Sequence, residues 1–426
     1  MTAAQEERQR QMYRWVILVG VCLIGFMTVG TRATLGNFFK SIIADLHWDR
    51  GTISFVVAVN LWISGFLQPF TGHLLDRFGA KWLFAASVAG YGLGVGLIGF
   101  TDSLGYLLVV YGLLVGAATA GASISLTNAL VAQWFRDWRA FAMSINNASA
   151  ALGQLVLVYI SYLMLEASGW RVSHFYLGAA VLVVTLPLAL LMPRRSLHAS
   201  EAAGGTRGGA GRQQVSAGPL ETTSWAKALC SAPLWQLNGG YFVCGMTVSL
   251  FAVHLIPFAT DRGFSPETAA KAFGFMATIS VAGSLLSGAV SDRVGRKNIL
   301  AMAYLTRGAA FAVLLLWRHE VALYVFAVLG GLSWLATPPS VMALTGEIYG
   351  MRALGTLGGI SLLAHQIGGG ASVWLAGVLH DLTGSYDLSF TLAAVALLGA
   401  SLLSFSIAER RYSVRYIAPA SMPTGD

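Results

Sequence analysis

Long apolar stretches alternate with short polar segments along almost the whole chain of 426 residues. A helix needs about 20 mostly apolar residues to cross the hydrocarbon core of a bilayer. Stretches of this length occur in two sets of six, at residues 14–36, 52–74, 82–101, 105–133, 140–165 and 172–192, and then at residues 232–258, 268–290, 298–317, 321–345, 354–379 and 386–408. The pattern predicts an all-α integral membrane protein of about twelve transmembrane helices, arranged as two six-helix bundles.

A polar break separates the two sets of apolar stretches. From Pro193 to about Trp225 the chain is rich in Gly, Ala, Arg, Ser and Gln and shows no apolar periodicity, which is typical of a flexible linker. We therefore expect four regions: an N-terminal six-helix bundle at residues 1–192, a cytoplasmic linker at 193–230, a C-terminal six-helix bundle at 231–409 and a cytoplasmic tail at 410–426.

The composition agrees with a membrane protein. Hydrophobic residues make up 56% of the chain and charged residues only 11%, whereas soluble proteins carry roughly a quarter charged residues. This argues against a soluble enzyme, and without a phosphate-binding loop motif ATP-driven pumping is unsupported. The three cysteines have no metal or redox spacing, so we expect no metal site and no cofactor. Cys22 and Cys244 lie in apolar stretches, which favours a role as small buried apolar residues.

Lysine and arginine are distributed unevenly over the polar segments. The net charge of +8 comes from single or paired basic residues between apolar stretches, a pattern of membrane topology rather than of nucleic-acid binding. With the N-terminus inside, 19 of the 27 basic residues lie in inner segments and 6 in outer segments, which predicts that both termini are cytoplasmic. We expect a monomeric, multi-pass protein of the cell inner membrane that contacts the lipid bilayer and no nucleic acid.

The pattern G-x-x-x-D-R-x-G-x-K occurs twice, at residues 72–81 and 288–297. The copies are offset by about half the chain and each follows the second helix of its half, so we expect two pseudo-symmetric bundles. The glycines permit a tight turn, and the charged side chains can engage neighbouring helix ends across the halves. The alternative is a pair of solvated loops that carry only topology charges. We assign conformational gating to Gly72, Asp76, Arg77, Lys81, Gly288, Asp292, Arg293 and Lys297.

These two motifs closely resemble the loop signature of the major facilitator superfamily. The resemblance covers almost the whole chain and implies two bundles that rock about a central site near the membrane midplane. Further stretches resemble the group of monocarboxylate transporters and oxalate:formate antiporters, at residues 134–135, 139–144, 169–171, 254–263 and 381–387. This resemblance implies a secondary active transporter that takes up a small organic anion, with a monocarboxylate as the favoured substrate, together with a proton by alternating access.

The sequence departs from that group at one position. Many members carry an arginine in the eighth helix that holds the substrate carboxylate, four residues before the glycine that opens the second motif, and here this position is Ser284. The competing hypothesis is proton-coupled efflux of an amphipathic or toxic compound. Drug exporters commonly have an arginine in the fourth helix and a G-P-x-x-G-G-like run in the fifth. Neither signature is present here, so export is disfavoured.

Ionisable residues inside the predicted helices are few, and such residues are costly in a bilayer and usually functional. No Asp or Glu lies at mid-helix. Arg32, toward the outer end of the first helix, either contacts an anion in the cavity or extends to the outer interface. Arg307 lies in the middle of the ninth helix, which is peripheral in this superfamily, so pairing with a carbonyl or a lipid headgroup is favoured.

Polar and aromatic residues complete the predicted site. His365 lies mid-membrane in the eleventh helix, where it either contacts a carboxylate, carries a proton or simply packs. For His254, nearer the outer end of the seventh helix, gating or local capping is as reasonable as substrate contact. Trp334 precedes a helix break at Pro338 and Pro339, which favours a gate or cavity wall. Amides either bind substrate or join helices. The predicted substrate-binding set is Arg32, Asn60, Asn128, Gln154, His254, Trp334, His365 and Gln366.

Overall fold

A computed structural model describes residues 3–135, 139–192, 220, 225–349 and 354–412, with most of the side chains within them. In this part of the chain, eleven segments are long and apolar enough to cross a membrane. One of them, Ile145–Leu190, has 46 residues, about twice the length that one crossing needs. It belongs to α8 (Arg139–Leu190), which breaks at Gly169 with φ 74° and ψ 170° and therefore makes two crossings. The prediction of about twelve transmembrane helices is confirmed.

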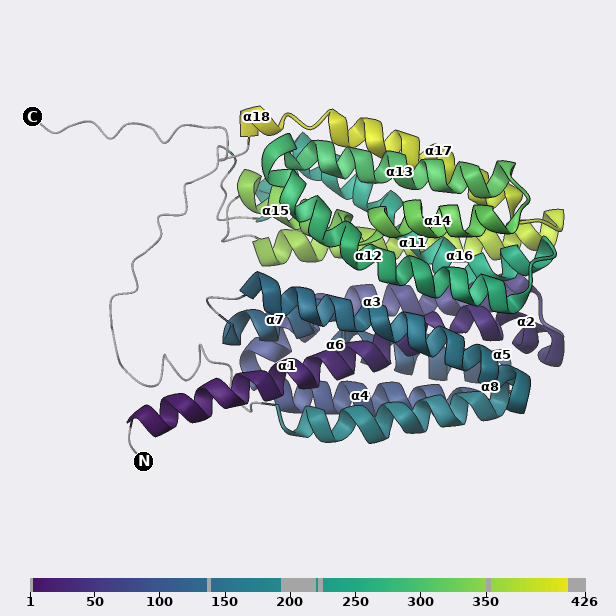
Figure 1. The fold of residues 1–426 in the computed structure, drawn as a ribbon, viewed down its shortest axis with the longest axis horizontal. Helices are drawn as coiled ribbons and strands as arrows, with labels where there is room; N and C mark the ends of the chain where they lie inside the picture. The colour runs from purple at the N-terminus through teal and green to yellow at the C-terminus, as the bar shows by residue number, and fades with distance from the viewer. Residues whose placement is uncertain (1–2, 136–138, 193–219, 221–224, 350–353, 413–426) are drawn as a thin grey trace, which may run out of the picture.

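The helices form two bundles that lie side by side with roughly parallel long axes (Figure 1). The N-terminal bundle contains α1 (Ala3–Ala33), α2 (Leu35–Leu46), α3 (Arg50–Phe78), α4 (Ala80–Leu97), η1 (Ile98–Phe100), α5 (Leu104–Leu107), η2 (Leu108–Val115), α6 (Gly116–Gly121), α7 (Ile124–Trp134) and α8. After α10 (Trp225–Ala228), the C-terminal bundle contains α11 (Ala232–Asp261), α12 (Pro266–Val294), α13 (Arg296–Leu316), α14 (Glu320–Trp334), α15 (Thr337–Tyr349), α16 (Leu354–Thr383), α17 (Asp387–Phe405) and α18 (Glu409–Tyr412).

The first and last helices begin and end at the same end of the bundles. This end, where α1 begins and α18 lies, is on the left in Figure 1 and is called the terminal end. The opposite end, where α2 and α5 lie, is called the distal end. Of the predicted linker, residues 193–230, the structure describes only Leu220 and residues 225–230. The boundaries of the four predicted regions therefore stay a prediction.

Four glycines with positive φ mark equivalent turns in the two bundles. Gly79 (φ 80°) separates α3 from α4, and Gly295 (φ 99°), the corresponding glycine of the second loop motif, separates α12 from α13. Gly169 (φ 74°) breaks α8, and Gly384 (φ 71°) lies at nearly the same place in the second half, between α16 and α17. Only glycine adopts this conformation readily, because it has no Cβ. The tight turns predicted from the two motifs are confirmed at Gly79 and Gly295.

Small residues let the helices of each bundle approach closely. A Cβ at Gly30 of α1 would lie 2.6 Å from the carbonyl oxygen of Gly153 in α8. In the C-terminal bundle, a Cβ at Gly245 of α11 would collide with the carbonyl oxygen of His365 in α16. Helices in membranes associate through such close packing, since lipid gives little hydrophobic drive between them. The packing fixes the backbone around the predicted site residues on α1 and α16.

A helix break in each bundle lies toward the terminal end. In the C-terminal bundle α14 ends at Trp334 and α15 begins at Thr337, directly before Pro338 and Pro339. Proline has no N–H and is tolerated in a first helical turn, which explains the position of this break. In the N-terminal bundle, α6 ends at Gly121 and α7 begins at Ile124. Each break frees backbone carbonyls that need donors inside a membrane.

Candidate functional site

Arg32 lies in the last turn of α1, where its side chain is partly exposed. It lies in the electrostatic neighbourhood of two aromatic residues, Tyr91 of α4 and Tyr111 of η2. Among the described residues, no hydrogen bond or ion pair is found for its guanidinium. Asn60 of α3 is near the same place, because its amide donates to the carbonyl of Tyr111 at 2.7 Å. Arg32 and Asn60, far apart in sequence order, are thereby brought to one region of the N-terminal bundle.

The other predicted amides of this bundle lie on α7 and α8. The Asn128 amide donates to the side-chain oxygen of Asn147 at 3.0 Å and accepts from Asn146 at 2.8 Å. Asn146 is fully buried and was missed by the sequence analysis, although it directly precedes Asn147. Gln154 is partly buried, and no hydrogen bond to its side chain is found in the described part of the chain. The asparagines therefore join two helices, while Gln154 keeps its amide available.

His365 and Gln366 lie side by side on α16 at the interface between the bundles. His365 Nδ1 is 3.4 Å from Gln366 Oε1, and its ring lies 4.7 Å from that of Tyr241. Gln366 packs against α3, since a Cβ at Gly65 would lie 2.7 Å from the Gln366 Cβ. Trp334 is partly exposed and contacts Phe251 edge to face at 5.0 Å. These predicted residues belong to one region of the C-terminal bundle.

Arg307 of α13 lies in the centre of that region and is fully buried. Its Nη2 donates to the carbonyl oxygens of Ser333 at 2.6 Å and Trp334 at 3.3 Å. Its Nη1 lies 3.2 Å from Cys244 Sγ and 3.3 Å from Thr247 Oγ1. The expected peripheral position is therefore wrong, because the side chain turns into the bundle rather than toward lipid headgroups. Pairing with a carbonyl, the favoured hypothesis, is confirmed.

The helix break explains the position of this guanidinium. Pro338 has no N–H, so the carbonyl of Trp334 has no helical donor four residues later. Arg307 donates to the carbonyls of Ser333 and Trp334 from a neighbouring helix, and the Thr337 hydroxyl adds a longer hydrogen bond to Trp334 at 3.4 Å. The same guanidinium contacts Cys244, whose thiol also lies 3.1 Å from Thr337 Oγ1. Cys244 is buried, as expected of a cysteine in an apolar stretch, but its sulfur is also part of a polar cluster.

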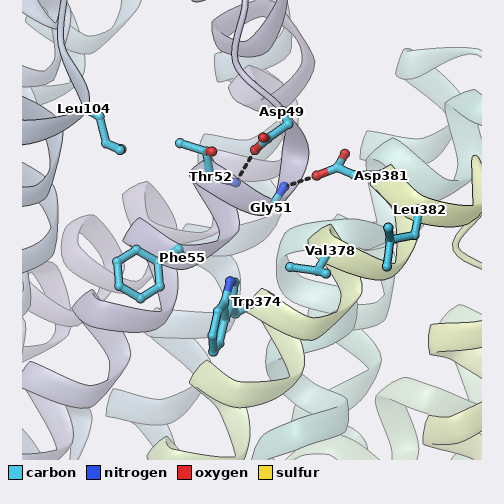
Figure 2. Close-up of a pocket in the computed structure, with 9 residues that line it drawn as sticks. All are labelled: Asp49, Gly51, Thr52, Phe55, Leu104, Trp374, Val378, Asp381 and Leu382. Atoms are coloured by element: carbon cyan, nitrogen blue, oxygen red, sulfur yellow. Dashed lines mark hydrogen bonds between the residues drawn. The ribbon is translucent and has the colours of Figure 1, made fainter.

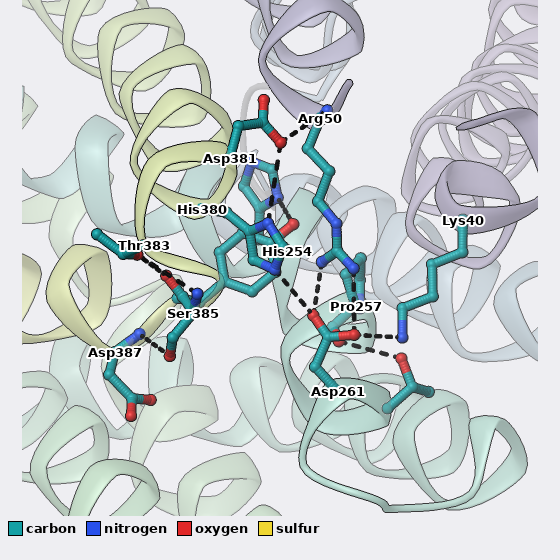
Figure 3. Close-up of polar contacts among 12 residues, drawn as sticks. Lys40, Arg50, His254, Pro257, Asp261, His380, Asp381, Thr383, Ser385 and Asp387 are labelled. Carbon is teal, nitrogen blue, oxygen red and sulfur yellow. Dashed lines mark hydrogen bonds and ion pairs between the residues drawn. The ribbon is translucent and has the colours of Figure 1, made fainter. Parts of the chain in front are cut away.

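His254 is completely buried on α11, close to the distal end (Figure 3). Its Nδ1 is 3.1 Å from the hydroxyl of Tyr386, and its Nε2 is 3.1 Å from the carbonyl oxygen of Val373. Its ring also meets Phe39 of the other bundle edge to face at 5.2 Å. Both ring nitrogens thus have partners within the C-terminal bundle. This arrangement joins three helices and leaves no nitrogen pointing toward an open space.

Asp261, at the end of α11, holds the two bundles together at the distal end (Figure 3). Its carboxylate binds the Arg50 guanidinium at 2.6 and 3.2 Å and the Lys40 amine at 2.6 Å. His380 Nε2 of α16 lies 3.4 Å from the same carboxylate. Arg50 and Lys40 come from the N-terminal bundle, whereas Asp261 and His380 come from the C-terminal bundle. Ion pairs at such half-exposed positions are individually modest, but several share one carboxylate here.

A second carboxylate, Asp381 of α16, binds the start of α3. It accepts from the backbone N–H groups of Arg50 at 3.1 Å and Gly51 at 2.6 Å. A helix N-terminus has free N–H groups and a partial positive charge, so it suits a carboxylate. Figure 2 shows this contact in a groove of about 500 Å³ between α3 and α16. We name Lys40, Arg50, Asp261, His380 and Asp381 the distal clasp.

The sequence analysis missed the distal clasp. Asp261 and Asp381 lie in stretches that it used only for a family resemblance, and Arg50 and Asp381 are 331 residues apart. Farther into the membrane, Trp62 Nε1 donates to the carbonyl of Ile367 at 3.3 Å and connects α3 to α16. Arg50 also lies 5.2 Å from the ring centre of Tyr386, so a further residue of the C-terminal bundle contacts it beside the clasp.

In the second loop motif, the described contacts of Lys297 and of the backbone at residues 296 and 297 lie within its own bundle. Lys297 Nζ donates to the carbonyls of Phe405 and Ile407, both at 2.9 Å, at the end of α17. Glu409 accepts from the backbone N–H groups of Arg296 and Lys297 at 3.1 and 3.2 Å. Lys297 therefore engages a neighbouring helix end as expected, but the expectation that this contact crosses between the halves is wrong for it.

The remaining motif residues are described unevenly. The Lys81 amine lies 5.8 Å from the ring centre of Trp82, and Arg293 is exposed. The side chains of five residues lie outside the described part of the chain, namely Gly72, Asp76, Arg77, Gly288 and Asp292. The gating role of the eight motif residues stays a prediction.

The model of the Major Facilitator Superfamily matches residues 21–372 and, in a second match, residues 237–419. The chain belongs to this superfamily. It is therefore a transporter in a membrane and not an enzyme, and the matched residues extend over both bundles described above. The resemblance predicted from the two loop motifs is confirmed.

Several relatives in this superfamily are similar to the chain over most of its length. The uncharacterised MFS-type transporter YcxA of Bacillus subtilis is 27% identical over 381 residues, 88% of this chain and 90% of the relative. Monocarboxylate transporter 13 of Rattus norvegicus is 25% identical over 399 residues, 91% and 87% of the two chains. The probable sulfoacetate transporter SauU of Cupriavidus necator is 24% identical over 424 residues, 93% and 94%.

A solved structure has the same fold. The inward-facing, unoccupied crystal structure of a bacterial homologue of the human lysosomal transporter Spinster superposes with a TM-score of 0.71. It covers 94% of this chain and 99% of its own chain at 16% sequence identity. This likeness concerns the arrangement of the helices.

Proposed function

We propose that the chain is a secondary active transporter that moves a small organic anion, with a monocarboxylate as the first candidate, across the cell inner membrane together with a proton. The observation that carries this proposal is the guanidinium of Arg32, partly exposed within a transmembrane helix and without a carboxylate partner among the described residues. Two of the relatives named above are a monocarboxylate transporter and a probable sulfoacetate transporter, and both names denote small organic anions.

The physical reason is the cost of charge inside a membrane. A carboxylate or sulfonate that leaves water needs a countercharge or several hydrogen-bond donors, because an unpaired buried charge is strongly disfavoured. Arg32 offers a planar guanidinium that binds such groups through two parallel hydrogen bonds. Gln154 is an amide of the same bundle that can add donors, whereas Asn60 is 1% exposed and its amide already donates to the Tyr111 carbonyl. We place both chain termini in the cytoplasm, as the distribution of Lys and Arg predicts.

Arg32 is tested by measuring binding to purified protein with lactate, sulfoacetate and the amphipathic cation ethidium as probes. Arg32→Gln is expected to weaken binding of the anion by about tenfold to a hundredfold, since a charge-assisted hydrogen bond contributes about 1.5–3 kcal/mol. Arg32→Lys should restore only part of this loss, because an ammonium lacks the bidentate geometry. Arg318→Gln removes an exposed arginine outside the helices and serves as the matched control.

Two results would contradict the anion assignment. If Arg32→Gln binds the anion as tightly as the parent protein, the arginine is an interface anchor. If ethidium binds and neither anion does, efflux of amphipathic compounds becomes the better hypothesis.

The distal clasp connects the two bundles at the end that must open and close during alternating access. Opening the distal end requires that the clasp residues of one bundle separate from those of the other, so we propose that the clasp holds the distal end closed. Asp261→Asn removes the carboxylate charge that Arg50 and Lys40 share. We expect the open-distal population to rise by an order of magnitude, roughly the effect of 1.4 kcal/mol.

The clasp is tested with spin labels at Gly105 and Leu382, which lie at the distal ends of the two bundles. The distance distribution should gain a longer component in Asp261→Asn. Asp49→Asn is the matched control, because Asp49 caps α3 at the same end but binds Thr52 of its own bundle. Equal distributions in the parent and Asp261→Asn proteins would remove the gating role of the clasp.

A further inference from the structure

The cluster around Arg307 has a counterpart in the other bundle with different chemistry. The offset that relates the two loop motifs also relates Arg307 to Tyr91 and Cys244 to Thr28. Tyr91 is also buried on the third helix of its bundle, and its hydroxyl donates to the carbonyl of Thr28 at 2.9 Å. The N-terminal bundle therefore fills this place with a neutral hydrogen bond. Packing at this position does not require a charge, so the guanidinium and thiol of the C-terminal bundle call for another explanation.

The charge of Arg307 is not balanced by a carboxylate. Its partners in the described part of the chain are hydroxyls, backbone carbonyls and one thiol, and none of these groups carries a charge while the thiol keeps its proton. Arginine keeps its proton in proteins, so this positive charge is permanent. A buried charge without a counterion is strongly disfavoured even when its hydrogen bonds are made. The Cys244 sulfur, 3.2 Å from Nη1, is the partner that can become an anion.

The surroundings of Cys244 suit a group that changes its protonation. The sulfur is 1% exposed and is faced by ionisable groups from three helices: Tyr241 on α11, Arg307 and Tyr304 on α13, and His365 on α16. Thr337 of α15 adds a hydroxyl at 3.1 Å.

Two of these neighbours matter for a thiolate. The hydroxyl of Tyr304 is fully buried and has no hydrogen-bond partner among the described residues. It lies against Gly240, one turn before Cys244 on α11, where a Cβ would be 3.4 Å from it. It is therefore a spare donor on the face of α11 that carries the thiol. His365 is partly exposed and can connect the buried thiol to the space between the bundles.

We propose that Cys244 carries the coupling proton of this transporter, held beside the fixed charge of Arg307. In one state the S–H bond is intact. In the other the proton has passed through a nitrogen of His365 to water in the space between the bundles, and the sulfur keeps the electron pair as a thiolate that pairs with Arg307. The reverse step restores the thiol. This inference rests on the proton coupling in the proposed function, and it adds a second ionisable group beside His365 to helices in which no carboxylate lies at mid-membrane.

The direct test follows the S–H stretching band in the infrared spectrum of the purified protein. A Cys22→Ser, Cys230→Ser variant keeps Cys244 as its only thiol and leaves the cluster intact. We expect the band to disappear as the pH rises through the working range and to return on acidification. The matched control adds Thr28→Cys and Cys244→Ser, which moves the thiol to the equivalent place opposite the neutral Tyr91. There the band should persist over the same pH range.

A second test uses proteoliposomes with a pH-sensitive dye inside and an inward gradient of lactate or sulfoacetate. Cys244→Ser should lose proton flux coupled to the anion by at least tenfold while anion exchange at equal pH continues. Thr28→Ser, the matched change in the other bundle, should leave both unchanged.

The outcomes separate this inference from the proposed function. An S–H band that stays constant with pH overturns the proton role of Cys244, even if the anion is transported with a proton. Coupled proton flux that survives in Cys244→Ser but disappears in His365→Gln also overturns it and assigns the proton to the histidine alone. Loss of anion binding in Arg32→Gln bears only on the proposed function, because Arg32 lies in the other bundle.

Discussion

In the N-terminal bundle the buried hydroxyl of Tyr91 donates to a backbone carbonyl, whereas the equivalent position of the C-terminal bundle holds the guanidinium of Arg307. The donors beside the two helix breaks also differ in charge. The Ala120 carbonyl beside the N-terminal break accepts from the Thr71 hydroxyl at 3.3 Å, and the carbonyls beside the C-terminal break accept from Arg307. Both bundles supply donors to the carbonyls of a broken helix, the N-terminal bundle with a hydroxyl and the C-terminal bundle with a guanidinium in addition to the Thr337 hydroxyl.

The distal ends of the bundles differ in a second way. In the N-terminal bundle Arg171 binds Asp45 at 3.1 Å and donates to the carbonyls of Gly99 and Thr101. In the C-terminal bundle Asp387 binds Arg262 at 2.6 Å. The offset between the loop motifs places Asp387 at the equivalent of Arg171 and Arg262 directly after the equivalent of Asp45. The ion pair therefore recurs at the same place in both bundles but is reversed in sign.

These differences teach which features the fold requires. At the distal end each bundle has an ion pair and a donor for the end of its third helix, since Arg262 donates to the carbonyl of Leu314 in α13 as Arg171 does to Gly99, and either sign arrangement provides both. In the buried centre it requires donors for a broken helix, and a neutral hydroxyl is sufficient. A charge at the centre therefore exceeds the structural need and points to function.

The largest expected effect separates the two buried centres. Arg307→Met removes the guanidinium donors from the carbonyls of Ser333 and Trp334 and leaves Trp334 with the weak hydrogen bond from Thr337, so the free energy of unfolding should fall by about 2–4 kcal/mol. Tyr91→Phe removes a single neutral hydrogen bond and should lower it by about 0.5–1.5 kcal/mol. Denaturant or thermal unfolding in detergent measures both variants. Equal losses would mean that the guanidinium carries no more structural weight than the hydroxyl.

Substitutions at the glycine turns should have nearly the same effect on stability in the two bundles. Gly79→Ala and Gly295→Ala force a Cβ into a backbone conformation that only glycine tolerates, so each should lower the free energy of unfolding by about 1–3 kcal/mol. Gly399→Ala is the control, because Gly399 lies in helix α17 with open space around it, and there alanine should be neutral or stabilising. A loss confined to one bundle would show that the turns are not equivalent.

The smallest effects are expected at the reversed ion pairs. Arg262 is 11% exposed and Arg171 is 35% exposed, so water and salt screen the N-terminal pair more strongly. Arg262→Gln should destabilise by about 1–2 kcal/mol and Arg171→Gln by less than about 1 kcal/mol. Combining Arg262→Asp with Asp387→Arg should recover part of the loss of either single change, as a double-mutant cycle would reveal. If the double variant recovers none of the lost stability, other neighbouring residues determine which charge each of these two positions must carry.

The sequence was sufficient for the backbone and insufficient for the side-chain contacts. Hydropathy, the glycines at 79 and 295 and the prolines at 338 and 339 predicted the two bundles, two turns and one break. The direction of Arg307 could not be predicted, because a membrane helix is apolar on nearly every side and its periodicity does not mark the face that points inward. The distal clasp could not be predicted either, since its partners belong to different bundles and loop charges give no sign of pairing.

The reversed ion pair also bears on how two similar halves can diverge. Reversing a pair takes two substitutions, and the protein between them carries two like charges or one unpaired charge. At the distal end Asp45 and Asp387 are 47% and 45% exposed, so water solvates the like or unpaired charges of the single-substitution protein. Such a protein loses little stability, and either arrangement of the two charges can evolve. Arg307 is 0% exposed and supplies donors to a broken helix. Once an arginine occupies this position, its later replacement leaves carbonyls beside the helix break short of donors unless other substitutions supply them first. The acquisition of this arginine is therefore difficult to reverse.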